Sequence, residues 1–265
     1  FIALFGGGPA GIHAGLLLVS LGNTTLLYFL VRSWSDATGA AVAAFLLAIL
    51  LVSPSVLGFA AHATHFVVFW ALFGCLLLER FLRHGAGWEA LAAGAAFGCA
   101  TLMKLPGVLF FLFALILPFA TWKMRGSTLR ESLLAAGLLL GGYLIPLAGT
   151  VAWFGAAGAL GEFYFWNLEY PSMVAGEAGA TGLLPRIFRN AMQAAGNFLP
   201  VWLAAVACFA YLLTGRRSAG IRTRIALFFF FSCAALFVGY ETRSHYFVLA
   251  LPAVALLLER LAARG

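Results

Sequence analysis

Residues 88–122 read WEALAAGAAFGCATLMKLPGVLFFLFALILPFATW, two apolar runs divided by the tetrapeptide KLPG at 104–107. Each run has about 17 residues, which is close to the length of a membrane-spanning helix. The runs are too long and too uniformly apolar for the alternating strands of a membrane barrel. This stretch therefore predicts two short membrane helices joined by a tight turn. Because the helices are short, we expect the turn to lie below the membrane surface and to face a cavity.

The composition of the whole chain follows the same pattern. Of its 265 residues, 63% are hydrophobic and 9% are charged, and the mean hydropathy is +1.01. No soluble domain of this length has such a composition. The predicted fold class is all-α: one polytopic integral-membrane helical bundle, a single domain over residues 1–265, with about nine transmembrane helices. The predicted spans are residues 9–31, 37–59, 62–82, 88–104, 106–122, 131–154, 197–214, 224–240 and 244–262.

The basic residues predict the orientation of these helices. Cytoplasmic loops carry an excess of Lys and Arg, and the orientation that satisfies this rule places 12 of the 16 basic residues inside. The four left outside are Lys104, Arg186, Arg189 and Arg243. Because an outer cation opposes the topology rule, we expect another role for these four. A phosphate group near the outer leaflet is the simplest ligand.

Other classes of function find little support in the sequence. The net charge of +7 does not indicate nucleic-acid binding, because the inner loops hold most of it. The four cysteines fall within predicted spans and are interpreted as small buried hydrophobic residues. No glycine-rich phosphate loop, nucleophile elbow or zinc motif is present. We therefore expect no cofactor and no metal site; a divalent metal is possible but not indicated.

Lys104 is the first candidate ligand for the outer phosphate. It ends an apolar run, where a lysine costs roughly 3 kcal/mol unless its ammonium group pairs or reaches the headgroups. One interpretation is a phosphate ligand that faces a cavity. The alternative is a side chain that snorkels to the outer headgroups.

The second candidate is the short outer turn at residues 240–247. Arg243 can hold a phosphate bidentately, and His245 and Tyr246 can donate hydrogen bonds to the same group or to a sugar. The alternative is an interfacial belt of Tyr and His with an internal pair between Glu241 and Arg243.

Further candidates for contact with a substrate flank these two. His62 and His65 share one face of the third span and suit a sugar or phosphate contact. The alternatives are two satisfied interfacial histidines and a metal site, which the spacing alone would allow although no third ligand is evident. Glu169 and Tyr170 belong to an aromatic, acidic stretch that can bind a sugar by stacking and hydrogen bonding; a solvated loop is the alternative.

The only long stretch outside the predicted spans is residues 155–196, an expected extracytoplasmic loop. Within it, residues 183–195 have the periodicity of an amphipathic helix, with Arg186 and Arg189 on the polar face. Such a helix should lie flat on the outer interface.

Four stretches of the chain together resemble a known family of membrane enzymes. They are SPSVLGFAAHATHFVVFWALFGCLLLERFLR at 53–83, GAAFGCATLMKLPGVLFF at 94–111, GEFYFWNLEYP at 161–171 and SHYFVLALPAVALLLE at 244–259. In this order they resemble the dolichyl-phosphate-mannose–protein mannosyltransferase family, including bacterial members related to lipid A aminoarabinose transferases. These enzymes belong to the GT-C superfamily of integral-membrane glycosyltransferases.

The resemblance implies transfer of a sugar from a polyprenyl-phosphate donor at the extracytoplasmic face of a bacterial inner membrane, with inversion at the anomeric carbon. It implies that Lys104 lies near the carrier phosphate and that His245 and Tyr246 line the active cavity. The acceptor stays open among a lipid, a glycan and a protein. The resemblance also implies an acidic catalytic base upstream of Phe1, so we expect the chain to be an N-terminally truncated part of a longer protein.

The main alternative function is a transporter or flippase for an anionic or lipid-linked substrate. It would use the same outer cations, but it would also need polar residues along the inner halves of the spans. Few are present beyond the short polar run at residues 23–25. A glycosyltransferase is therefore the favoured reading.

Overall fold

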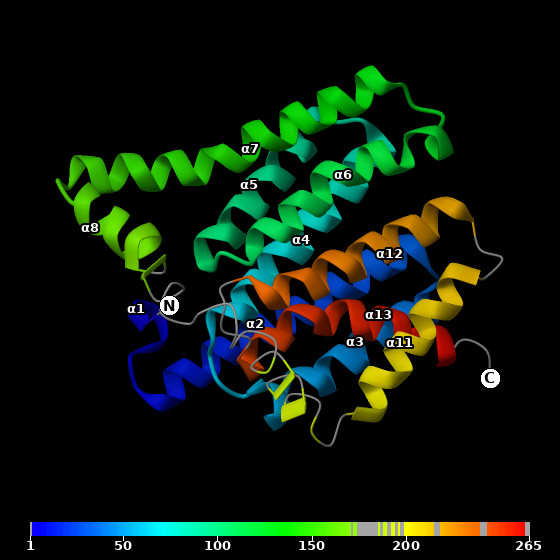
Figure 1. Ribbon diagram of the computed structural model, residues 1–265, viewed down its shortest axis with the longest axis horizontal. Coiled ribbons are helices and arrows are strands. Elements are labelled where there is room, and N and C mark those ends of the chain that lie inside the picture. The colour runs from blue at the N-terminus through cyan, green and yellow to red at the C-terminus, as the bar shows by residue number, and fades with distance from the viewer. Residues whose placement is uncertain are drawn as a thin grey trace.

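The computed structural model describes residues 2–170, 172–173, 185, 188–189, 192–193, 196, 199–214, 218–238 and 243–262. All regular structure in these residues is helical, as predicted (Figure 1). The first half contains α1 (Ile2–Phe5), α2 (Pro9–Trp34), α3 (Ala37–Leu51), η1 (Pro54–Val56), α4 (Ala63–His84), α5 (Gly87–Met103) and α6 (Gly107–Arg125). The second half contains α7 (Leu129–Ala156), α8 (Leu160–Tyr164), η2 (Phe165–Glu169), α11 (Leu199–Thr214), α12 (Ala219–Ala234), η5 (Ala235–Phe237), η6 (Ser244–Ala250) and α13 (Leu251–Ala262).

Helix length and hydropathy make this a multi-pass membrane protein. Within the described residues, five helical segments are long and apolar enough to cross a bilayer: α2, α4, α6, α7 and the continuous segment Ala219–Phe237. The helices at the other predicted positions are shorter. They are Ala37–Leu51, Leu199–Leu213 and Ser244–Glu259, together with α5, which has 17 residues. The full number of nine crossings stays a prediction.

The second predicted span, 37–59, extends too far, because α3 ends at Leu51. A residue before proline is driven out of the helical region, and Ser53, which precedes Pro54, is extended with φ −67° and ψ 129°. Leu57 then takes a left-handed φ of 52°. The prediction extended the span because the residues that follow Pro54 are apolar. In the structure these residues form a compact turn.

A close helix contact joins α5 to α7 and depends on glycine. A Cβ atom on Gly94 would lie 2.1 Å from the carbonyl oxygen of Leu139. One on Gly142 would lie 2.0 Å from that of Leu91. Small residues commonly let membrane helices approach this closely. The contact holds α7 along α5, while the far end of α7 extends away from the bundle toward α8 (Figure 1).

An aromatic cluster joins the two halves of the chain. The ring of Phe228 on α12 packs 6.2 Å from Phe110 and 5.6 Å from Phe113, both on α6, measured between centroids. It also lies 6.3 Å from the ring of Trp34 at the end of α2. Edge-to-face pairs of this kind add to the burial of the rings. The cluster therefore fixes α12 against α2 and α6.

Candidate functional site

Four of the predicted site residues meet at one end of the bundle, which we call the Lys104 end. His62 directly precedes α4, and Lys104 caps the C-terminus of α5. His245 and Tyr246 lie in the first turn of η6. Segments separated by more than a hundred residues in sequence thus supply one small cluster, as the expectation of a common phosphate site requires.

The KLPG turn holds Lys104 in a sharp corner. Its backbone is extended, with φ −166° and ψ 141°, while its N–H still donates to the carbonyl of Ala100 over 3.2 Å. The Gly107 N–H donates back to the Lys104 carbonyl over 2.9 Å. A Cβ atom on Gly107 would lie 2.4 Å from the Ala100 carbonyl carbon, so only glycine fits where α6 turns back on α5. The corner fixes the point from which the lysine side chain reaches η6.

The Lys104 ammonium group makes two contacts with η6. Its Nζ lies 3.0 Å from Nε2 of His245 and 3.8 Å from the ring centroid of Tyr246. An ammonium group can only donate hydrogen bonds, so Nε2 of His245 must accept. This requires a neutral imidazole that carries its proton on Nδ1. The aromatic face of Tyr246 stabilises the same cation electrostatically.

His62 extends the cluster by stacking on His245. The two imidazole rings are nearly parallel, with centroids 4.1 Å apart and planes inclined by 15°. Partial burial, and then the positive charge of Lys104, lower the pKa of His62 below its usual 6.5. Stacking, burial and the neighbouring ammonium group all favour the neutral ring.

Two side chains, Lys104 and Arg243, carry positive charge at this end. Arg243 is exposed directly before η6, and its charge acts on His245 beside that of Lys104. Two cations on one surface, with histidine and tyrosine groups beside them, suit a small anion such as a phosphate. Among the described residues, no three His, Cys, Asp or Glu side chains are grouped to hold a metal ion.

The other predicted site residues differ in their burial. His65 is fully buried, and its backbone carbonyl accepts a hydrogen bond of 3.1 Å from the side chain of Asn23. Glu169 and Tyr170 are exposed beyond α8, where the Tyr170 ring lies 5.4 Å from that of Trp166. Sugar binding by this aromatic group stays a prediction.

The predicted interfacial helix at 183–195 falls mostly outside the described residues, and Arg186 is among those left out. Five of its positions are described, and each is helical and exposed: Pro185, Phe188, Arg189, Met192 and Gln193.

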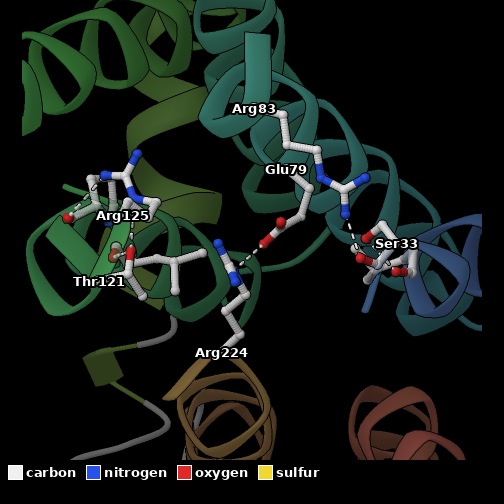
Figure 2. A network of polar contacts seen from close by, with 9 residues as sticks. Ser33, Glu79, Arg83, Thr121, Arg125 and Arg224 are labelled. Atoms are coloured by element: carbon white, nitrogen blue, oxygen red, sulfur yellow. Dashed lines mark hydrogen bonds and ion pairs between the residues drawn. The ribbon is translucent and has the colours of Figure 1, made fainter. Parts of the chain in front are cut away.

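Sequence reasoning missed a polar network at the opposite end of the bundle, which we call the Glu79 end (Figure 2). Glu79 is buried on α4 with its Oε1 3.1 Å from Nε of Arg224. Glu89 is also buried and accepts a 2.9 Å hydrogen bond from Arg80. The sequence did contain one signal for this network. Glu79 directly follows an apolar run, where a carboxylate becomes buried with the helix, and a buried carboxylate requires a cationic partner.

Comparison with known proteins agrees with this architecture. The family model for dolichyl-phosphate-mannose–protein mannosyltransferase matches residues 1–153. No curated protein sequence matches the chain. Among solved structures, it is similar to the oligosaccharyltransferase of the archaeon Archaeoglobus fulgidus. The complex of that enzyme with an inhibitory peptide and a dolichol-phosphate superposes with a TM-score of 0.56 at 15% identity, over 98% of this chain and 40% of that one.

Two further structures of the archaeal enzyme agree. The apo form has a TM-score of 0.55 at 16% identity, covering 99% of this chain and 41% of the other. The complex with zinc and sulfate has a TM-score of 0.54 at 18% identity, covering 99% and 39%. The chain thus spans about two fifths of the length of the enzyme it matches, and shares the GT-C fold over that part. With more than half of its length matched by the family model, the chain belongs to the dolichyl-phosphate-mannose–protein mannosyltransferase family.

Proposed function

We propose that this chain forms part of a membrane glycosyltransferase that moves a sugar from a polyprenyl-phosphate donor to an acceptor, with inversion at the anomeric carbon. The observation that carries the proposal is the meeting of Lys104, His245 and Tyr246 at one end of the bundle, with Nζ of Lys104 3.0 Å from Nε2 of His245. Membership of a family named for a dolichyl-phosphate-linked donor supports the same substrate class.

In this reaction the cluster would stabilise the leaving group. When the bond between the anomeric carbon and the phosphate oxygen breaks, negative charge develops on the phosphate. A fixed ammonium group is most effective where such charge appears. Lys104 is already held in place by the KLPG corner and by Tyr246. Neutral His245 and His62 can donate hydrogen bonds without adding further positive charge, and Arg243 supplies a second cation.

We place the Lys104 end at the extracytoplasmic face of a bacterial inner membrane, with nine crossings in all. The positive-inside rule supports this orientation, because the cation-rich Glu79 end then faces the cytoplasm. Residues 155–196 would form an outer loop, in which Glu169, Tyr170, Arg186 and Arg189 are placed to contact sugar, lipid or acceptor. The acceptor is a lipid, a glycan or a protein.

Substitution of Lys104 tests the proposal. In the full-length protein, Lys104→Ala should weaken binding of a polyprenyl-phosphate-linked sugar roughly ten- to hundredfold, because a hydrogen bond to a charged group contributes about 1.5–3 kcal/mol. Lys104→Arg should restore only part of the loss, since the longer planar group does not fit the same geometry. Donor titration and measurement of sugar transfer give the two readouts.

Lys123→Ala is the matched control. Lys123 is the other lysine of the chain, lies in the last turn of α6 at the Glu79 end and also contacts an aromatic ring, that of Trp122, with Nζ 5.5 Å from the centroid. It should retain normal donor affinity. If Lys104→Ala binds and transfers as well as the wild type, the lysine has no part in the donor site and the proposal is wrong.

A further inference from the structure

A second basic site lies at the Glu79 end, between the C-terminal turns of α2 and α4. A pocket of about 450 Å³ opens there. Its lining residues are Phe29, Arg32, Ser33, Leu76, Glu79, Arg80, Arg83 and His84. The pocket shares no residue with the Lys104 cluster, so it requires a separate explanation.

Two arginines in this pocket are held near each other by the end of α2. The Arg83 guanidinium donates to the carbonyl of Ser33, which Figure 2 shows, and that of Arg32 donates to the carbonyl of Ser35 over 3.3 Å. The last carbonyls of a helix carry partial negative charge and favour cations. Both guanidinium groups are thereby fixed at one helix terminus. A guanidinium has five N–H donors, and each of these contacts uses one.

The acidic residue that lines the pocket, Glu79, and the neighbouring Glu89 are engaged by other arginines. Glu79 pairs with Arg224 over 3.1 Å, and Glu89 accepts from Arg80 over 2.9 Å. Both carboxylates are buried, at 2% exposure each, whereas Arg32 and Arg83 are exposed. The accessible surface of the pocket is therefore positive, and its natural ligand is an anion.

The remaining lining indicates which anion. Phe29 is 51% exposed and Leu76 is half-buried, and both lie one or two turns farther into the bundle than the arginines on the same helices. These helices are long enough to cross a membrane, so the apolar part of the pocket continues into the hydrocarbon region while the arginines stay at headgroup level. A soluble phosphate compound would leave the apolar part unused, whereas a lipid fills both.

We propose that this pocket binds an anionic phospholipid of the adjacent leaflet. Its phosphate would lie between Arg32 and Arg83, and an acyl chain would pass along Phe29 and Leu76. Basic pockets between membrane helices recognise acidic lipid headgroups in this way. The site would bind a membrane lipid as a structural partner, at the opposite end of the bundle from the proposed donor site.

Native mass spectrometry of the purified whole protein tests the proposal. With phosphatidylglycerol added, the wild type should retain a lipid adduct that the double variant Arg32→Gln/Arg83→Gln loses at least roughly tenfold, as expected for two charge-assisted contacts. Arg130→Gln, an exposed arginine at the start of α7 outside the pocket, should retain the adduct. If the double variant does not fold, Arg32→Gln alone removes an exposed side chain and should lower retention severalfold.

Two comparisons identify the ligand class. Phosphatidylcholine has no net charge, so it should bind much more weakly than phosphatidylglycerol, and inorganic phosphate at the same concentration should not displace the lipid. Equal retention of the two lipids, or an undiminished adduct on folded arginine variants, would overturn the proposal. Displacement by equimolar phosphate would show a site for a free anion and would also overturn it.

Discussion

The cation of Lys104 and the ring of His245 constrain each other's protonation. With Nε2 of His245 occupied as an acceptor 3.0 Å from Nζ, protonation of that nitrogen would place two positive charges in contact. His62, stacked 4.1 Å from His245, is subject to the same field. The cluster therefore keeps one strong cation beside two neutral rings, which is a defined charge state for an anionic ligand to meet.

The lowered pKa of His62 predicts a pH dependence of stability. In the unfolded chain His62 titrates near 6.5, and in the folded protein it titrates lower. Between these two values the unfolded state binds more protons, so the free energy of unfolding falls as the pH falls through 6.5 and stops falling below the folded pKa. Thermal unfolding from about pH 8 to about pH 5 should therefore show a shallower decline in His62→Gln than in the wild type. His13→Gln, at an exposed position on α2, serves as control. Identical slopes for the wild type and His62→Gln would contradict the prediction.

At this scale the sequence predicted a common site for Lys104, His245 and Tyr246, because a lysine ends an apolar run and a polar turn interrupts two spans. The structure brings the three side chains together, and their role in binding a donor stays a prediction. The sequence could not distinguish His62 from His65. The two are three positions apart, but the helix begins at Ala63, so His62 faces η6 while His65 is enclosed. Only the exact start of α4 decides between them, and helix boundaries are the least determined feature of a sequence.

At the scale of elements, the contact between α5 and α7 predicts that glycine positions on one helix differ sharply. Gly142→Ala would place a methyl group 2.0 Å from the Leu91 carbonyl oxygen and force the helices apart. We expect it to destabilise the protein by about 1–3 kcal/mol, the usual cost of overpacking. Gly137→Ala and Gly149→Ala lie on the same helix with nothing within 4 Å, and should be neutral or slightly stabilising because alanine favours the helix. Denaturation in detergent measures all three, and equal effects would refute the close packing.

The pair between α4 and α12 gives a second prediction. Glu79→Gln leaves the Arg224 side chain, 16% exposed, without its carboxylate partner. Removing one member of a buried ion pair costs about 3–5 kcal/mol, and we expect the lower part of that range because Arg224 retains some contact with solvent. Replacing both residues, as Glu79→Gln/Arg224→Met, should recover much of the loss. Glu131→Gln, which alters only an exposed helix cap at Thr128, should cost less than Glu79→Gln. If the double variant is destabilised as much as Glu79→Gln, loss of the ion pair is not the cause of the destabilisation.

The elements themselves were largely predictable, since long apolar runs determine helices in lipid almost uniquely. The boundaries were less so. The sequence extended the second span beyond Leu51, and started the eighth at residue 224 although α12 begins at Ala219. The second span was extended because apolar residues continue past the proline that ends α3. The eighth span was started too late because the first turns of α12 include arginines. Arg224 there pairs with a buried carboxylate, a tertiary contact that composition cannot reveal.

At the scale of the whole molecule, the two ends of the bundle carry different sets of charged side chains. The Lys104 end carries a few cations gathered around aromatic and imidazole rings, whereas the Glu79 end carries many arginines with the buried Glu79 and Glu89 among them. α5 connects the two ends with only 17 residues, about 25 Å of helix, against a hydrocarbon core of about 30 Å. Lys104 should therefore lie slightly within the membrane, where a positive charge is costly to desolvate and a phosphate ligand is correspondingly favoured.

This arrangement predicts a fixed orientation, which labelling can determine. After replacement of Cys75, Cys99, Cys208 and Cys233, single cysteines at Ser172 and Ser244 should react with a membrane-impermeant thiol reagent added outside intact cells. Single cysteines at Ser127 and Ser218 should react only after permeabilisation. The reason is that Ser127 and Ser218 flank the basic segments of the Glu79 end, which the positive-inside rule keeps in the cytoplasm, whereas Ser244 adjoins the Lys104 cluster. Reversed labelling would put the cluster on the cytoplasmic side and exclude an extracytoplasmic donor site, while the contacts within the cluster would stand.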